Sequence, residues 1–264
     1  MYPFDIVFGL DLYDLSIVVG FFVALLFFRF WADRRGFSAR LQNLCIVGAL
    51  VGIMGGFGLA VVTQAFYNYM ESGIFEIGST TGATFYGGLI GGAACFLLIY
   101  FVGGRFLLRD REQFTRFFSL SEIAAGSIAL AHGFGRIGCL FAGCCHGRVT
   151  DAWYGVYNAY LGENTLPVQL FEATFLFALS FYLTYRLGKQ QKGNLGIYLI
   201  AYAVWRFFAE YLRDDQRGAT VVSFLTPSQL IAVLLVALGG GLWLFEYYLT
   251  KRSIKKGTDG NDGT

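Results

Sequence analysis

Long apolar segments recur along this 264-residue chain and constrain its fold more than any other feature. Seven can be drawn, covering approximately residues 15–30, 43–66, 84–102, 120–135, 168–186, 195–212 and 224–249. Several approach the roughly 20 residues that a helix needs to cross a bilayer, and only a helix satisfies its own backbone polar groups in lipid. We therefore expect an all-α, polytopic integral membrane protein with seven transmembrane helices.

The composition agrees with a membrane protein. Charged residues make up 14% of the chain, whereas soluble domains average about 25% and need these charges to cover their surface. We expect one membrane domain over residues 1–256 and a disordered polar tail over 257–264. No phosphate-binding loop or dinucleotide motif is present, so we expect no cofactor and no nucleic-acid partner.

Basic residues alternate between the two ends of the expected helices. The connections after the first, third, fifth and seventh segments hold 15 of the 20 Lys and Arg residues. Because cytoplasmic loops carry an excess of Lys and Arg, these four connections are predicted to be cytoplasmic. The N-terminus is then outside and the C-terminus inside.

The remaining basic residues are all arginines, predicted in the outer half or the outer loops: Arg136, Arg148, Arg206, Arg213 and Arg217. One interpretation is ordinary pairing, of Arg206 with Glu210 and of Arg213 with Asp214 or Asp215. The other is an anion site at the outer face, which we favour because a charge within an apolar segment points to function.

The segment "YAVWRFFAEYLR" places Tyr202, Arg206, Glu210 and Arg213 at i, i+4, i+8 and i+11. On one helix these residues form a polar stripe, which in lipid must face the bundle interior. Arginine offers a planar fork of donors that suits phosphate, and Glu210 can hold either arginine in place. The alternative is an ion-pair ladder that only fixes helix packing.

Two further motifs lie at the outer ends of segments. Gln169 and Glu172 follow Pro167 at the start of the fifth segment, where either can orient an arginine or simply cap the first turn. In "FYGGLIGG", the glycines that include Gly87 and Gly88 favour close helix packing, and Tyr86 is placed to contact a lipid head group.

The stretch "HGFGRIGCLFAGCCHG" (132–147) combines glycines, an arginine and thiols. Its glycines predict a flexible or tightly turned outer end to the fourth segment. Arg136 then emerges beside the membrane surface, where it suits an anionic head group.

Cys139, Cys144, Cys145 and His146 offer the ligand count of a Cys₃His zinc site. The spacing differs from common zinc motifs and adjacent cysteines rarely chelate one ion, so we expect no metal. A disulfide such as Cys139–Cys144 and simple apolar packing both stay open.

Four stretches, in order, resemble the signatures of prolipoprotein diacylglyceryl transferases: "YGGLIGG", "GRIG", "LPVQLFEA" and "YAVWRFFAEYLR", followed by a similar "TPSQL". The resemblance covers most of the chain and includes the seven spans and their orientation. It implies a bacterial cytoplasmic membrane enzyme whose site faces the outer side. Such an enzyme moves a diacylglyceryl group from the membrane lipid phosphatidylglycerol to the lipobox cysteine of a secreted prolipoprotein.

The resemblance also implies roles for particular residues. Arg136 and Arg206 would grip the lipid phosphate, Tyr202 would hydrogen-bond near it, and Glu210 and Arg213 would order the outer end. The catalytic candidates are Arg136, Arg206, Tyr202, Tyr86 and His146. The substrate-binding candidates are Arg136, Arg206, Glu210, Arg213, Gln169, Glu172, Gly87 and Gly88.

The chain departs from the family pattern at several polar positions. Tyr86 and Leu166 stand where the family has histidines. The asparagines and glutamate of the family's GRxGNFxNGE are replaced by Cys139, Ala142 and Cys144. His146, His132 or Tyr86 would have to supply a base. Two alternatives follow: altered lipid-linked or thiol chemistry at the cysteines on the same fold, or a non-catalytic protein that binds anionic lipid.

Overall fold

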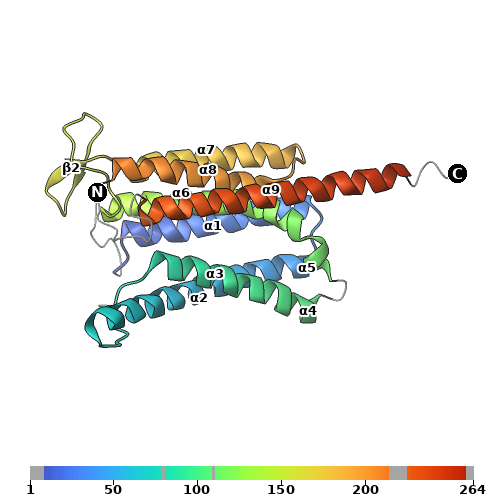
Figure 1. Ribbon diagram of the computed structural model, residues 1–264, viewed down its shortest axis with the longest axis horizontal. Helices are drawn as coiled ribbons and strands as arrows, with labels where there is room; N and C mark the ends of the chain where they lie inside the picture. Colours follow the sequence, from blue (N-terminus) through green and yellow to red (C-terminus); the bar gives the residue numbers. More distant parts are fainter. Residues whose placement is uncertain (1–8, 79–80, 109–110, 214–224, 260–264) are drawn as a thin grey trace. The chain divides into compact units, whose positions relative to one another are not determined.

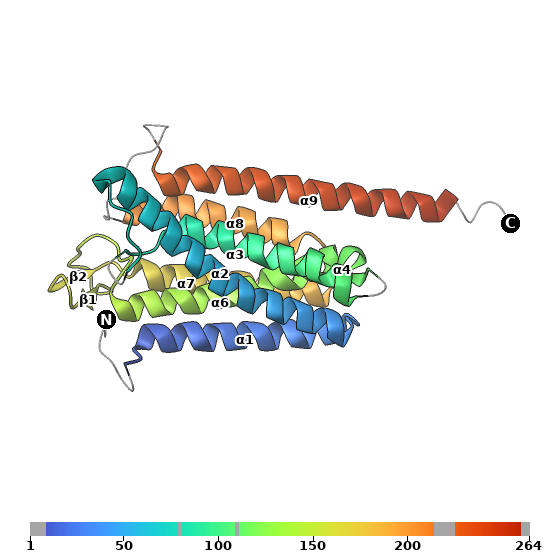
Figure 2. The ribbon, with the colours of Figure 1, turned by 90° about the horizontal axis from the view of Figure 1, so that it is seen from below.

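The computed structural model describes residues 9–78, 81–108, 111–213 and 225–259. Among them are seven helical segments that are long and apolar enough to cross a membrane (Figures 1 and 2). These segments are Leu12–Arg34, Ala39–Met70, Gly87–Leu107, Phe117–Ala142, Val168–Gly188, Asn194–Leu212 and Pro227–Leu249. The prediction of a mostly helical chain with seven candidate membrane-spanning helices is confirmed.

The elements follow in the order α1 (Leu12–Arg34), α2 (Ala39–Ser72), α3 (Phe85–Leu98), a π-helical turn (Ile99–Gly103), α4 (Gly104–Leu107), α5 (Glu112–Thr115), α6 (Phe117–Ala142), β1 (Val156–Asn158), β2 (Glu163–Thr165), α7 (Val168–Gly188), α8 (Asn194–Ala209), a 3₁₀ turn (Glu210–Leu212) and α9 (Pro227–Asp259). The third span therefore joins α3 to α4 through the π-helical turn. Of the tail predicted over 257–264, residues 260–264 lie outside the described residues.

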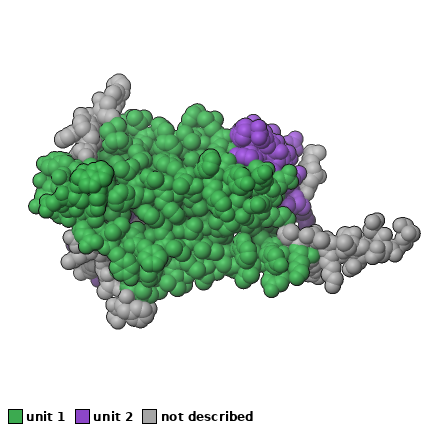
Figure 3. All heavy atoms as spheres, turned by 90° about the horizontal axis from the view of Figure 1, so that it is seen from above, with its two compact units in different colours: residues 1–28, 118–264 green, residues 29–117 purple. Residues whose placement is uncertain are grey.

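The chain divides into two compact units (Figure 3). Unit 1 comprises residues 1–28 and 118–264, and unit 2 comprises residues 29–117. In unit 1, residues of α6, α7 and α8 form a hydrophobic core, which consists of Ala125, Ala129, Leu176, Leu179, Leu183 and Tyr198. The expectation of one membrane domain over 1–256 stays a prediction.

Unit 2 is built on close contact between α2 and α3. A Cβ added at Gly56 would lie 2.8 Å from the Gly88 carbonyl oxygen, and one added at Gly87 would lie 2.9 Å from the Leu59 carbonyl oxygen. The small residues therefore let the two backbones approach each other, as the glycine pattern indicates.

The fourth span is longer than predicted, because α6 continues to Ala142. The glycines that suggested a turn lie inside this helix, at points of close packing. A Cβ at Gly133 would lie 2.7 Å from the Phe177 ring, and one at Gly138 would lie 3.1 Å from the Tyr13 ring. The turn comes at Gly143, whose φ is +74°. Arg136 is consequently a helix residue with 14% of its side chain exposed, and it does not emerge at a loop.

The polar stripe predicted on one helix is interrupted at its end. The helix α8 ends at Ala209, the 3₁₀ turn follows, and Arg213 has extended backbone angles of −97° and 156°. Arg213 instead pairs with Gly147 in an antiparallel bridge. The prediction that Arg213 continues the helical stripe is therefore wrong.

A small antiparallel hairpin, which the sequence did not suggest, joins α6 to α7. Its strands β1 and β2 pair Val156 with Thr165 and Asn158 with Glu163. The hairpin lies beyond the end of α7 and α8 (Figure 1). Asn158 is buried and donates a hydrogen bond to the Gly143 carbonyl over 3.0 Å, so the hairpin fixes the chain that leaves α6.

Candidate active site

A buried carboxylate joins three helices of unit 1. Glu172 of α7 is fully buried, and its Oε1 lies 3.1 Å from Nε of Arg136 in α6. The Tyr202 hydroxyl of α8 donates a hydrogen bond to the same oxygen over 3.0 Å. Glu172 Oε2 is buried and has no hydrogen-bond partner among the described residues. The glutamate thus holds an arginine and a tyrosine at one point and keeps a second oxygen available.

His132, one of the three residues that the sequence offers as a base, belongs to the same cluster. Its Nε2 lies 3.9 Å from Glu172 Oε1, and its Nδ1 lies 3.3 Å from the Tyr198 hydroxyl. Its ring meets that of Tyr202 edge-on, with centroids 4.7 Å apart. Sequence spacing indicates this position, because His132 precedes Arg136 by one helical turn and therefore shares its helix face, as Tyr198 does with Tyr202.

Arg206 lies one turn beyond Tyr202 on α8 and is 8% exposed. Its Nη2 lies 3.1 Å from Glu210 Oε2 and donates a hydrogen bond to Ser228 Oγ of α9 over 2.9 Å. Ser228 comes from the "TPSQL" stretch. The ordinary pairing considered for Arg206 and Glu210 is therefore present.

Arg136 and Arg206 lie at the same cluster, which contains Glu172, Tyr202 and His132. Arg136 of α6 and Tyr202 of α8 meet at Glu172 Oε1, and Arg206 follows Tyr202 by one turn of α8. Each arginine is paired with one carboxylate, the fully buried Glu172 or the 9% exposed Glu210, so the charges of the two pairs cancel. A guanidinium has five N–H donors, so an ion pair through one nitrogen leaves Arg136 with further donors for an anion.

Gln169 lies one helical turn before Glu172. Its Nε2 donates a hydrogen bond to the Cys144 carbonyl over 2.6 Å. Of the two residues considered for orienting an arginine, Glu172 contacts Arg136, whereas Gln169 holds the chain that follows α6. This bond connects the carboxylate helix directly to the cysteines.

The cysteine cluster consists of Cys139, Cys144 and Cys145, whose sulfur atoms all lie within 4.8 Å of one another. All three thiols are free, so the disulfide Cys139–Cys144 that we considered is absent from the structure. Hydrogen bonds from the Cys139 and Cys144 thiols, together with the guanidinium of Arg213, lower the pKa of the Cys145 thiol well below its usual range. The cluster thus favours a thiolate at Cys145.

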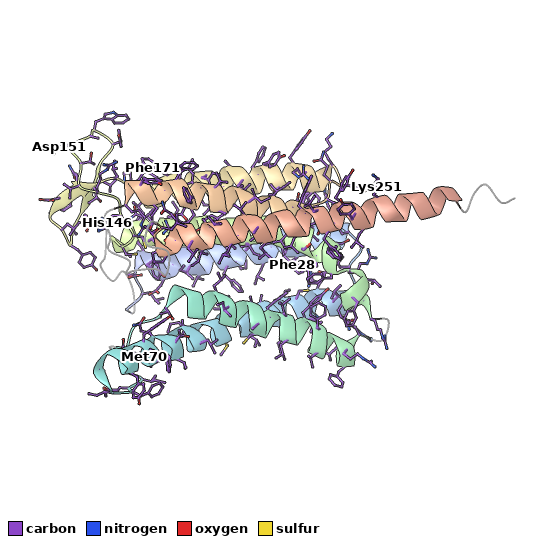
Figure 4. The ribbon with its side chains drawn as sticks, in the orientation of Figure 1. Phe28, Met70, His146, Asp151, Phe171 and Lys251 are labelled. Atoms are coloured by element: carbon purple, nitrogen blue, oxygen red, sulfur yellow. The ribbon has the colours of Figure 1, made fainter. Side chains whose placement is uncertain are left out.

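Several predicted residues lie elsewhere or outside the described part. His146 lies next to the hairpin (Figure 4), and its Nδ1 is 2.8 Å from the Gly147 carbonyl oxygen. Gly87 and Gly88 belong to unit 2. The Tyr86 side chain and the whole of Asp214, Asp215 and Arg217 lie outside the described residues. The site roles predicted for these residues stay predictions.

The fold and site define a class, namely a multi-pass membrane protein with seven candidate spans and with arginine–carboxylate pairs where several helices meet. Residues 2–245 match the family described as prolipoprotein diacylglyceryl transferase. The chain belongs to this family of membrane transferases.

Three relatives that are named for this activity match most of the chain. The phosphatidylglycerol–prolipoprotein diacylglyceryl transferase 2 of Clostridium perfringens is 32% identical over 249 residues, which are 90% of this chain and 92% of the relative. The corresponding transferase of Clostridium tetani is 31% identical and covers 88% of this chain and 92% of its own length. The transferase of Chromohalobacter salexigens is also 31% identical, over 86% of this chain and 84% of its own length.

Proposed function

We propose that this chain transfers a diacylglyceryl group from phosphatidylglycerol to the lipobox cysteine of a prolipoprotein. Family membership and the names of the relatives support the donor and the acceptor. In this reaction the acceptor sulfur forms a bond to a carbon of the diacylglyceryl group. The bond between that carbon and a phosphate oxygen breaks, and glycerol phosphate leaves with the electron pair.

The observation that carries the proposal is the position of Arg136 and Arg206 at one cluster: Arg136 shares Glu172 Oε1 with Tyr202, and Arg206 follows Tyr202 by one turn of α8. Negative charge develops on the phosphate as its bond to carbon breaks, and donors already in place stabilise that charge most effectively in an apolar site. A guanidinium carries five N–H donors, so pairing with one carboxylate oxygen leaves Arg136 with donors for a phosphate. Arg206, held by Glu210 and Ser228, is the second phosphate ligand.

Tyr202 and Glu172 are proposed to position Arg136. The Tyr202 hydroxyl and Arg136 Nε meet at the same Glu172 oxygen, which restricts the orientation of the guanidinium plane. Glu210 holds Arg206, and Gln169 and Arg213 order the chain around the cysteines. The glycines Gly87 and Gly88, with Tyr86, stay in the proposal as family-based contacts to the lipid.

We also propose a location in the bacterial cytoplasmic membrane, with the N-terminus and the site on the outer side and the C-terminus in the cytoplasm. The distribution of 15 of the 20 Lys and Arg residues over alternate connections supports this orientation. An outward-facing site suits a precursor that has already been secreted.

Complementation tests the function. The chain is expressed in a bacterium depleted of its own transferase, and a reporter prolipoprotein is analysed by mass spectrometry. We expect the mass of a diacylglyceryl thioether with the parent chain and with Arg29→Ala, because Arg29 pairs with Asp33 at an exposed surface. Arg136→Ala and Arg206→Ala should yield none. If the parent chain accumulates in the membrane without lipidating the reporter, the proposed function is wrong.

A further inference from the structure

The proposed reaction needs the acceptor thiol to become a thiolate. Of the three residues that the sequence offers as a base, His132 lies against Glu172 and Tyr198 in the buried cluster. Tyr86 stands where the family has a histidine, and His146 contacts the Gly147 carbonyl. The cysteine cluster lies at the end of the helix that carries Arg136, and Gln169 connects it to the helix of Glu172. Its first member, Cys139, lies one helical turn beyond the proposed phosphate ligand Arg136.

The sulfur positions fit one metal ion. Cys139, Cys144 and Cys145 Sγ atoms all lie within 4.8 Å of one another. A tetrahedral zinc ion with Zn–S bonds of about 2.3 Å places its sulfur ligands about 3.8 Å apart. Small rotations of the cysteine side chains reach that separation, whereas a disulfide requires two sulfurs at about 2.05 Å.

The backbone removes the objection that adjacent cysteines rarely share an ion. Gly143 and Cys145 have φ angles of +74° and +60°, and the chain between them turns back towards the last turn of α6. Both Cys144 and Cys145 thereby direct their sulfurs to Cys139. Hydrogen bonds from Asn158 to the Gly143 carbonyl and from Gln169 to the Cys144 carbonyl hold this turn.

The charges of the thiolates, the metal ion and a neighbouring arginine also sum to zero. Three thiolates and one divalent cation carry a net charge of −1. The guanidinium of Arg213 lies beside Cys145, held there by the bridge between Arg213 and Gly147. The sum is zero, which is the arrangement that a partly buried centre next to a membrane tolerates best.

We propose that Cys139, Cys144 and Cys145 bind one Zn²⁺ ion through three thiolates, with the fourth position open to the acceptor thiol. Cys144 is exposed, so the centre is reachable from outside. The role of the open position adds activation of the acceptor thiol to the proposed function, and this role rests on that function. A thiol that coordinates zinc loses its proton, here to water, and so becomes a nucleophile without a neighbouring histidine. The sulfur then attacks the lipid carbon as glycerol phosphate leaves, and the zinc ion stays divalent throughout.

Cobalt substitution tests the metal site. The full chain is purified in detergent under reducing conditions, and Co²⁺ is added while thiolate-to-cobalt charge-transfer absorption is recorded. We expect one Co²⁺ per chain, displaced by Zn²⁺. Cys139→Ser, Cys144→Ser and Cys145→Ser should each weaken binding at least tenfold, whereas Cys45→Ser and Cys95→Ser, in unit 2, should not. Circular dichroism measures the helix content of each serine variant, and only the variants that remain folded are compared.

Two results would overturn the metal site. One is a parent chain that shows no charge-transfer band although its thiols titrate as free. The other is a band that persists undiminished in the folded variants of all three cysteines. Because Cys144→His retains a zinc ligand, this variant should recover binding that Cys144→Ser loses, and failure to recover it also counts against the site.

A second experiment tests the open position. A lipobox peptide with one cysteine is added to the Co²⁺-loaded chain, and the same peptide with serine serves as the control. A fourth thiolate should raise the charge-transfer absorption per ion by about one third, and equal spectra with the two peptides would overturn the role in thiol binding. Because these readouts do not depend on turnover, a failed complementation with intact cobalt binding would reject the proposed function and leave the metal site standing.

Discussion

At the scale of single residues, Glu172 is the side chain on which the cluster depends. It is fully buried, pairs with Arg136 and accepts the Tyr202 hydroxyl hydrogen bond at the same oxygen. A buried guanidinium that loses its carboxylate is left uncompensated, which destabilises a protein by about 3–5 kcal/mol. Loss of a hydrogen bond to a charged group is a smaller effect of about 1.5–3 kcal/mol.

We therefore predict that Glu172→Gln lowers the melting temperature more than Tyr202→Phe does. Gln keeps the size of the side chain but removes the negative charge, whereas Phe removes only one donor. Thermal unfolding of both variants in the same detergent measures the difference. Equal shifts, or a larger shift for Tyr202→Phe, would show that Arg136 does not depend on this carboxylate.

The sequence identified most of these residues as candidates but not their contacts. Helical spacing showed that Tyr202 and Arg206 share a face, and the family motifs pointed to Glu172 and Arg136. Spacing within one helix says nothing of which faces of different helices meet. The contacts of His132 with Glu172 and Tyr198 arise between α6, α7 and α8, so only the packed structure reveals them.

At the scale of elements, glycines determine how closely α2 and α3 approach. A Cβ at Gly56 would meet backbone atoms of α3 at 2.8 and 3.1 Å, and backbone cannot rotate away as a side chain can. Two residues further on, Gly58 faces open space. The same Gly→Ala substitution can therefore be compared at a packed position and at an open position of one helix.

Gly56→Ala is expected to destabilise the protein by about 1–3 kcal/mol through overpacking. Gly58→Ala should be neutral or stabilising by up to about 1 kcal/mol, because alanine favours the helix. Thermal unfolding and the yield of folded protein in the membrane report both changes. If the two variants behave alike, α2 and α3 do not pack as described.

The start of α8 depends on a buried acid from another helix. Glu122 of α6 accepts hydrogen bonds from the Gly193 and Asn194 amides over 2.6 and 2.9 Å. Glu122→Gln should weaken this cap by about 1.5–3 kcal/mol, since the bonds to a charged acceptor are lost. Hydrogen exchange at residues 193 and 194 should accelerate at least tenfold, whereas Glu163→Gln, on an exposed strand residue, should leave it unchanged. Unaltered exchange in Glu122→Gln would contradict the cap.

Element boundaries were harder to predict than the elements themselves. Apolar runs marked all seven spans, because lipid leaves a spanning segment few alternatives to a helix. The sequence predicts the end of the fourth span seven residues before α6 ends, since a glycine that permits close packing cannot be distinguished by sequence from a glycine that forms a turn. The hairpin and the departure of Arg213 from α8 depend on contacts between distant segments, which local pattern does not encode.

At the scale of the whole molecule, the distribution of basic residues leads to a topology that can be measured. A fluorescent protein fused after Thr264 should fluoresce, because it folds in the cytoplasm, whereas alkaline phosphatase at the same point should be inactive. A phosphatase inserted at Gly162, in the turn of the hairpin, should be active. The reverse pattern would place the site on the cytoplasmic side and contradict the proposed orientation.

The central claim is that Arg136 and Arg206 together hold the phosphate of the lipid donor. The most direct test measures the rate of diacylglyceryl transfer to a lipobox peptide in proteoliposomes that contain phosphatidylglycerol. We predict that Arg136→Ala and Arg206→Ala each reduce the rate by about 10²–10³-fold, as the loss of a transition-state donor does, while Arg29→Ala matches the parent. Folded Arg136→Ala and Arg206→Ala variants that retain a rate within twofold of the parent would contradict the account.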